Sequence, residues 1–409
     1  MSAQLVGVTA LGGVPLFNRQ VGLRHDEQSV PFATLAALNG VNLFSRLNDA
    51  DLQATSTKHS KIRWKVYVNN IVLILVASTN GIDDNYYTDK ILENLLERVF
   101  EALVFCSCLD EISNSQNVER LKRSLKSAYP FVDFLLQHLL DRDSHIYMIT
   151  NSVNYSLVDQ STSDFLSTVS ESIAQVAQTD FVSVVINRKL VFATKGWWTR
   201  IAPTKDAAVT LSFVDYIIPE LERETKNIKD TQVFLPENCP NSVTRLIVAK
   251  LHLSVYIIVL CDEKPSVDII TNALNVLKES ENCLTNFRRL ESVPIHLKLI
   301  VNEHIQSLIV YKHEQNLLVM QGNTDSSTLH LLATMGEISS QQTDKQSRSS
   351  FKPHESYLKV KNHHCYSVSH EHNKIFLLFS NTLAIEAVRE ISLQTLFVLK
   401  DKKVWPKTA

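Results

Sequence analysis

Residues 180–198 read DFVSVVINRKLVFATKGWW, an apolar run, a polar turn at Asn187–Lys189 and a second apolar run. Apolar, β-branched runs on either side of a short polar turn predict a β-hairpin. If the second strand continues through Gly196, consecutive side chains point to opposite faces, so Trp197 and Trp198 reach the helical layers on both sides of the sheet. The pair then belongs to the core or to a domain junction, or it anchors a partner, because Trp is enriched at interfaces.

The same pattern occurs twice more, at residues 5–17 and 308–320. After each hairpin the sequence predicts a helix, three strands and closing helices. The expected helices are Val30–Leu47, Tyr87–Leu109, Val118–Leu140, Ala207–Leu221, Val267–Phe287, Ser327–Ile338 and Thr382–Leu399. The expected strands after each first helix are Leu52–Thr57, Ile62–Val68, Ile71–Ala77; Gln232–Leu235, Val243–Leu251, Ser254–Cys261; and Tyr357–Val360, Cys365–Ser369, Ile375–Phe379. The repeated unit is ββαβββα.

The strands indicate how each unit is layered. IVLILVA, VYIIVL and IFLLF are apolar at successive positions, so both faces of each sheet are expected to be covered. Helices before and after the three-strand meander cover the two faces, which predicts an α/β class with three domains of mostly antiparallel sheet between helices. The expected boundaries are 1–145 for the first domain, 146–178 for a linker and connecting helix, 179–289 for the second domain and 290–409 for the third. Residues 339–356 are polar and are expected to form an exposed loop.

Composition excludes several classes of protein. The net charge of −2 argues against nucleic-acid binding, which needs a clearly basic face. The six cysteines are scattered without a CxxC pair, so we expect reduced, mostly buried thiols in a cytosolic protein. The longest apolar run, residues 251–261, is too short to cross a bilayer, and the N-terminus lacks the basic start of a signal peptide. A cytoplasmic location without a transmembrane segment follows as the expectation.

No pattern predicts catalysis or a cofactor. The chain has nine glycines and neither GxGxxG nor GxxxxGK[ST], the loops that cradle phosphates, and it lacks GxSxG. His363, His364, Cys365, His370 and His372 have a zinc-like composition. That segment fits a β-hairpin, however, and no second ligand cluster exists to close a site. We therefore expect no catalytic residues, no cofactor and no metal.

Several motifs resemble one family. They are GVPLF at 13–17, PF..L..LNGV..F at 31–44, WK at 64–65, NVERLK at 117–122 followed by Tyr129, and FVSVV with AT.GWW within 181–198. In this order and spacing they resemble the tri-longin family of planar cell polarity effectors. The motifs cover about the first half of the chain, and the second half shares only the repeated pattern.

The resemblance implies a noncatalytic subunit. It would pair with the protein Inturned, join a WD-repeat planar polarity effector in a ciliogenesis complex, and engage a Rab-like small GTPase as part of a guanine-nucleotide exchange factor. Such a protein would be cytoplasmic, at the cilium base and cytoskeleton. A longin-type membrane-trafficking adaptor with other partners is the alternative, since it would share the fold.

The resemblance also points to binding residues. In such heterodimers the first helix and the neighbouring edge strand of the first domain contact partners, and an edge strand exposes unpaired backbone groups. The corresponding side chains here are Phe32, Leu35, Leu38 and Val41 on the helix and Val14 and Leu16 on the strand. Each is alternatively a core residue.

A basic cluster lies off the apolar stripe of the helix expected from Val118. It comprises Arg120, Lys122, Arg123 and Lys126. The simplest interpretation is a solvated face supported by an ion pair between Glu119 and Arg123, four residues apart. The alternative is an anionic-surface patch that makes a peripheral membrane contact.

Overall fold

The computed structural model describes most of the chain. The described residues are 2–22, 31–78, 89–114, 117–141, 152–223, 227–292, 299–300, 302–312, 315–322, 354–360, 363–370, 373–380 and 382–401. The chain divides into two compact units, one of residues 1–148 with 232–244 and the other of residues 149–231 with 245–409. The three-domain boundaries expected from the sequence stay a prediction.

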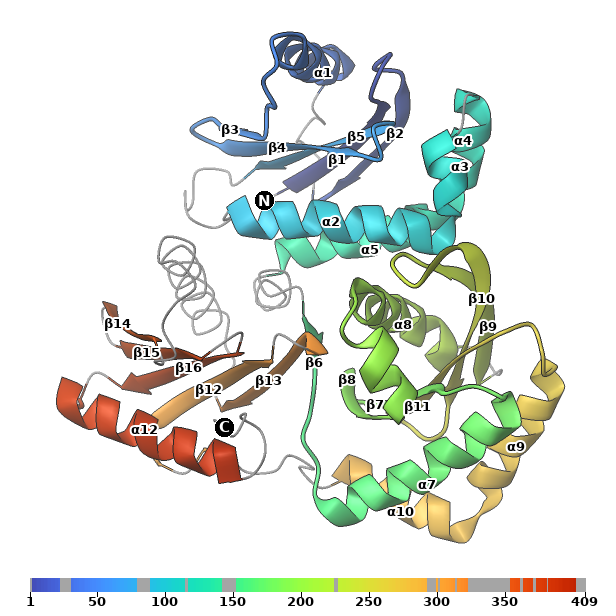
Figure 1. The fold of residues 1–409 in the computed structure, drawn as a ribbon, viewed down its shortest axis with the longest axis vertical. Helices are drawn as coiled ribbons and strands as arrows, with labels where there is room; N and C mark the ends of the chain where they lie inside the picture. The colour runs from blue at the N-terminus through green and yellow to red at the C-terminus, as the bar shows by residue number, and fades with distance from the viewer. Residues whose placement is uncertain are drawn as a thin grey trace. The chain divides into compact units, whose positions relative to one another are not determined.

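The first sheet has five antiparallel strands in the order β2-β1-β5-β4-β3. Their bounds are β1 Ser2–Thr9, β2 Pro15–Val21, β3 Ala54–Ser56, β4 Ser60–Tyr67 and β5 Ile71–Ser78. The run IVLILVA of β5 is buried at every position, as expected for a central strand covered on both faces. Helix α1 (Phe32–Leu47) covers one face, and α2 (Asp89–Cys106) and α5 (Tyr129–Leu140) cover the other (Figure 1).

The helices after this sheet are shorter than predicted. Helix α2 ends at Cys106 and is followed by the short α3 (Leu109–Asn114). The single helix expected over 118–140 is instead α4 (Val118–Leu125), a 3₁₀ turn and α5. The break has a local cause: Pro130 lacks an N–H and its ring does not fit a helix interior, so it stands in the first turn of α5.

The middle sheet repeats this topology with the order β8-β7-β11-β10-β9. The strands are β7 Phe181–Ile186, β8 Lys189–Ala193, β9 Ile228–Leu235, β10 Cys239–Lys250 and β11 Val255–Cys261. The opening hairpin turns at Asn187 and Arg188, whose φ angles of 50° and 61° suit a two-residue turn between twisted strands. The covering helices are α7 Gln160–Ala177, α8 Lys205–Arg223, α9 Val267–Glu279 and α10 Glu281–Ser292. The helix predicted over 267–287 is therefore broken at Ser280.

The third sheet has the order β14-β15-β16-β12-β13-β6. Its strands are β6 Val153–Asn154, β12 Ile305–Lys312, β13 Leu317–Gly322, β14 His354–Val360, β15 His363–His370 and β16 Asn373–Ser380, and α12 (Ile385–Asp401) packs on one face. The helix expected over 327–338 lies outside the described residues, as does most of the expected loop 339–356. Residues 354–356 belong to β14, so the loop prediction is wrong for its last three residues.

The segment expected as a polar linker contributes to two sheets. Strand β6 pairs in parallel with β13, and the Tyr155 backbone N–H donates to the Leu318 oxygen at 2.9 Å. One residue later, the Ser156 N–H donates to the Leu190 oxygen of β8 at 2.8 Å. Helix α7, also assigned to the linker, packs into the middle core through Leu166 and Ile173. These residues therefore belong to the folded layers.

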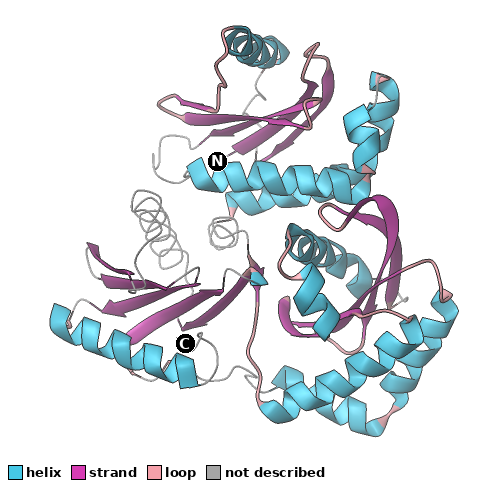
Figure 2. Cartoon of the chain, viewed as in Figure 1, coloured by secondary structure: helices cyan, strands magenta, loops and turns pink. Residues whose placement is uncertain are grey.

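The predicted fold class is confirmed. The three sheets are mostly antiparallel and are flanked by helices (Figure 2). Among the described helices, none combines the length and apolar character needed to cross a membrane.

Candidate partner-binding site

Helix α1 presents an apolar side to solvent. Val41, Phe44 and Leu47 are 54%, 68% and 84% exposed. Residues three apart lie on neighbouring positions of one helix side, so these side chains form a stripe. Exposed apolar residues that occur singly are ordinary, and a stripe of them on one element is a candidate interaction surface.

The inward side of α1 is unusually polar. Leu35, Asn39 and Asn42 are buried, and the Asn39 Oδ1 and Asn42 Nδ2 atoms have no hydrogen-bond partner within the described residues. A surface helix normally turns its apolar side to the core and its polar side to water. Here two amides face inward while Phe44 faces outward. The core side of α1 thus mixes leucines with two amides, and several of its apolar side chains remain on the solvent side, where another molecule could cover them.

The β1–β2 turn packs against the inner side of α1 and exposes two further apolar side chains. A Cβ atom at Gly13 would lie 2.2 Å from Asn39 Nδ2, and the φ of Gly13 is +61°, so only glycine brings the turn this close to α1. The turn exposes Leu11 and Val14. We call Leu11, Val14, Val41, Phe44 and Leu47 together the α1 surface.

The residues predicted to bind partners are divided between core and surface. Leu35 and Leu16 are buried, and Leu38 packs partly buried against the same core. Val14 and Val41 are exposed and belong to the α1 surface. The Phe32 side chain lies outside the described residues.

Sequence reasoning missed part of this surface. Leu11 and Leu47 were not singled out, and Phe44 entered as the last position of the motif at 31–44, without a binding role. The signal was present in Asn39 and Asn42, which interrupt the apolar positions and separate a second stripe from the first.

Strand β2 lies at the sheet edge, as predicted. Arg19 fastens it to α5, because Arg19 Nε donates to Asp133 Oδ1 at 2.7 Å and the guanidinium lies 5.2 Å from the centre of the Tyr129 ring. The hydrogen bond to Asp133 raises the pKa of Arg19, so the cation is retained at all ordinary pH. A firmly held edge strand is suited to pairing with a strand of another chain.

The expected path of the tryptophan pair is wrong. Strand β8 ends at Ala193, and Trp197–Ile201 form a turn of π-helix. A Cβ at Gly196 would lie 2.6 Å from the Asp180 oxygen, so glycine is needed where the chain leaves the sheet. Trp197 is fully buried, and Trp198 packs edge-to-face on Tyr155 with ring centres 5.6 Å apart. The pair therefore packs the middle domain and joins it to the segment around β6.

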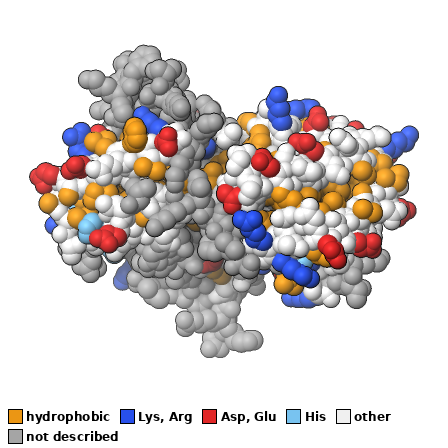
Figure 3. All heavy atoms as spheres, turned by 90° about the horizontal axis from the view of Figure 1, so that it is seen from below, with side chains coloured by type: hydrophobic (Ala, Val, Ile, Leu, Met, Phe, Trp, Pro, Cys, Tyr) orange, Lys and Arg blue, Asp and Glu red, His pale blue; other side chains and the backbone are white. Residues whose placement is uncertain are grey.

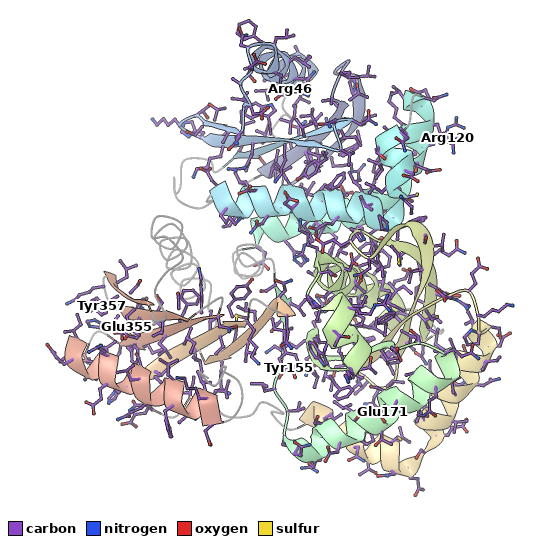
Figure 4. The ribbon with its side chains drawn as sticks, in the orientation of Figure 1. Arg46, Arg120, Tyr155, Glu171, Glu355 and Tyr357 are labelled. Carbon is purple, nitrogen blue, oxygen red and sulfur yellow. The ribbon has the colours of Figure 1, made fainter. Side chains whose placement is uncertain are left out.

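Two cations of the basic cluster on and after α4 are paired with nearby acidic side chains. Arg120, labelled in Figure 4, lies 3.3 Å from Glu111, and Lys122 Nζ lies 2.9 Å from Glu119. The predicted carboxylate pair of Glu119 with Arg123 is replaced by this Lys122 pair, while Arg123 Nε donates to the Glu119 backbone oxygen. The hydrogen bond from Lys122 lowers the pKa of Glu119, so the acid stays ionised. Lys126 is exposed, and binding of an anionic surface stays a prediction.

The histidine-rich segment forms strand β15, as the hairpin prediction required. His363 Nδ1 lies 3.0 Å from Gln306 Oε1, and His364 Nδ1 is hydrogen-bonded to the Tyr357 hydroxyl. Consecutive side chains on a strand point to opposite faces, so His363 and His364 do not converge on one point. His372 lies outside the described residues.

Charge is mixed on the face seen in Figure 3, where acidic, basic and apolar side chains are interspersed over the described residues. Such a face has no broad field of one sign. The α1 surface is the strongest candidate site among the described residues because it gathers exposed apolar side chains on one helix.

Comparison with known proteins places this site in a recognised domain. Residues 5–135 match the family described as the first longin domain of FUZ, MON1 and HPS1. This part of the chain is therefore similar to a longin domain. The matched longin domain contains the whole α1 surface.

Similar proteins from several vertebrates share one name, and their alignments cover most of this chain. Protein fuzzy homolog of Xenopus tropicalis is 26% identical over 97% of both chains. The human and mouse proteins of that name are 31% and 30% identical over 64% of this chain. These two alignments span 59% of the relatives' own length. The resemblance to the Fuzzy proteins inferred from the motifs is confirmed.

Proposed function

We propose that this chain is a noncatalytic binding subunit that pairs with Inturned in a planar cell polarity and ciliogenesis effector complex. That complex would include a WD-repeat planar polarity effector and engage a Rab-like small GTPase. The observation that carries the proposal is the exposed apolar stripe of α1, with Val41, Phe44 and Leu47 outside while Asn39 and Asn42 are buried. Similarity to proteins named fuzzy homolog supports a role in planar polarity and ciliogenesis, and Inturned is the partner that the family resemblance implies.

The exposed stripe of α1 and the edge strand β2 support a role in binding a partner protein rather than in contacting nucleotide. The exposed apolar stripe of α1 supplies burial energy, at about 25 cal/mol per Å² of apolar surface covered. The edge strand β2 supplies backbone groups that a partner strand can complete. In this account the chain contributes one half of a composite surface for the GTPase, and the nucleotide contacts lie on the GTPase.

The test is co-expression of the full chain with Inturned, followed by size-exclusion chromatography with light scattering. The wild-type pair should elute as a one-to-one complex. Val41→Glu with Phe44→Glu should abolish it, because two charges would be buried without partners. Since both side chains are exposed in the free chain, its stability should change by only about 0.5 kcal/mol.

The matched control is Val243→Glu with Leu253→Glu, which places the same two charges on side chains that are 42% and 70% exposed in the strands and turn of the middle sheet. It should leave the complex intact. If the α1 variant still forms the complex while remaining folded, the α1 surface is not the pairing site. If the wild-type chain forms no complex with Inturned, the proposed function as a whole is wrong.

A further inference from the structure

Strand β14 is an edge of the third sheet. It pairs with β15 along its whole length, from His354 against Ser369 to Val360 against His363. Within the described residues no strand pairs with its outer side. Alternate residues of an edge strand point their N–H and C=O groups outward, where another strand can bind them.

The charges of β14 are arranged for pairing with itself. Glu355 and Lys359 are its two charged residues, and they lie two positions on either side of Tyr357. An antiparallel pair of two β14 strands centred on Tyr357 sets Glu355 of each copy opposite Lys359 of the other. A shift of one residue in either direction removes both ion pairs. Charge therefore selects this register, as cross-strand pairs do in ordinary sheets.

Glu355 already has hydrogen-bond partners within its own chain, whereas Lys359 has no charge partner among the described residues. Glu355 accepts hydrogen bonds from Arg389 Nε at 2.8 Å and from the Tyr366 hydroxyl at 2.5 Å, which lower its pKa and hold it ionised and in place. Lys359 is exposed, and neither it nor the exposed Glu386 has a charge partner among the described residues. An incoming Lys359 would meet both carboxylates.

A hollow beside the strand adds apolar surface. It has a volume of about 320 Å³ and is lined by Glu355, Ser356, Tyr357, Tyr366, Ile385 and Arg389, with Glu386. Figure 4 shows Glu355 and Tyr357 on β14 beside the start of α12. Ile385 is 48% exposed in this hollow, so a strand paired to β14 would cover apolar as well as charged groups.

We infer that the outer edge of β14 binds the β14 strand of a second copy of this chain, in an antiparallel register centred on Tyr357. The interface is isologous, because each Glu355–Lys359 contact occurs twice about a twofold axis. It uses the third sheet, whereas the proposed Inturned contact uses the first domain. A complex with Inturned would then be a dimer of heterodimers.

The test is sedimentation equilibrium of the full chain and its charge variants. The wild-type chain should dimerise. Lys359→Glu alone and Glu355→Lys alone should each weaken dimerisation by about tenfold, because like charges then face each other twice. An equimolar mixture of the two variants should restore dimers, since each copy then supplies the charge that the other needs. Lys58→Glu, an equal charge change at an exposed residue of the first domain, is the matched control.

Glu355→Lys also loses the contact with Arg389 within its own chain, so its effect on dimerisation could have a second cause. A second measurement therefore tests the register independently of charge. Residue 357 faces itself across the axis, so Tyr357→Cys should form a disulfide-linked dimer on mild oxidation. Lys359→Cys, which faces Glu355, should not. A monomeric wild-type chain, an unaffected Lys359→Glu dimer, or equal cross-linking at positions 357 and 359 would each overturn the inference.

Discussion

At the scale of single residues, burial decides which side chains stabilise and which can bind. Trp197 is fully buried and Trp198 is half-buried, although the two are adjacent in sequence. The π-helical turn explains the difference, because it replaces the strand alternation that would have sent the two rings to opposite faces. Gly196 makes that turn possible by its close approach to Asp180.

Trp197→Ala should lower the free energy of unfolding by about 3 to 5 kcal/mol, the usual cost of deleting a large buried ring. Trp198→Ala should cost less, since part of that ring already contacts water. Guanidinium denaturation followed by circular dichroism measures both. Equal losses for the two variants would contradict this account of the turn.

Burial should also protect particular thiols. It raises the pKa of Cys106 and Cys365 to about 12 and that of Cys261 to about 11. The thiolate is the reactive form, and at pH 8 about one in a thousand of these groups or fewer would be ionised.

Alkylation with iodoacetamide at pH 8, read by mass spectrometry, should therefore leave these three cysteines unmodified in the folded chain. In denaturant they should react at the rate of a free thiol. Because each pKa is raised, protection should weaken as the pH rises toward 11 or 12. Rapid folded-state labelling of Cys365 at pH 8 would show that its site is open to solvent.

At the scale of elements, the segment around β6 joins two sheets. It pairs with β13 on one side and reaches Leu190 of β8 on the other, and Tyr155 packs against Trp198. This parallel pairing is long-range, so no local pattern in the polar stretch 151–164 indicates it. By contrast, the hairpins and meanders were predictable, because alternating runs and turn residues are local signals.

Tyr155→Ala should weaken the connection between these two sheets. The variant loses the ring contact with Trp198 and apolar packing in the third core, at a cost of about 2 kcal/mol. Limited proteolysis should then cut the chain faster near residues 152–158 than in the wild type. An unchanged cleavage rate would mean that backbone pairing alone holds the sheets together.

At the scale of the whole molecule, the same sheet order is used three times, and the third sheet adds β6 at its edge. The sequence was sufficient for the hairpin and the three-strand meander of each repeat, because both are local. The pairing that joins hairpin to meander, such as β1 with β5, is long-range and was not predicted. The sequence was insufficient for α1, where apolar residues lie on two sides of one helix. Only packing against the sheet decides that Leu35 turns inward and Phe44 outward.

Calorimetry of the full chain should reveal two cooperative units rather than three. Strands β7, β8 and β11 of the middle sheet and the described strands of the third sheet fall within one compact unit, and β6 and the residues after it bond to strands of both sheets. We expect two unfolding transitions, and Tyr155→Ala should broaden or split the one that belongs to the second unit. Three separate transitions in the wild-type chain would contradict this grouping.

The central claim is that the α1 surface is covered by Inturned. The most direct measurement is hydrogen exchange by mass spectrometry of this chain, alone and with Inturned. The account predicts slower exchange in Phe32–Leu47 and in the β1–β2 turn when Inturned is present, while α9 exchanges as before. Unchanged exchange in α1 upon formation of a stable complex would contradict the claim and direct the search to another face.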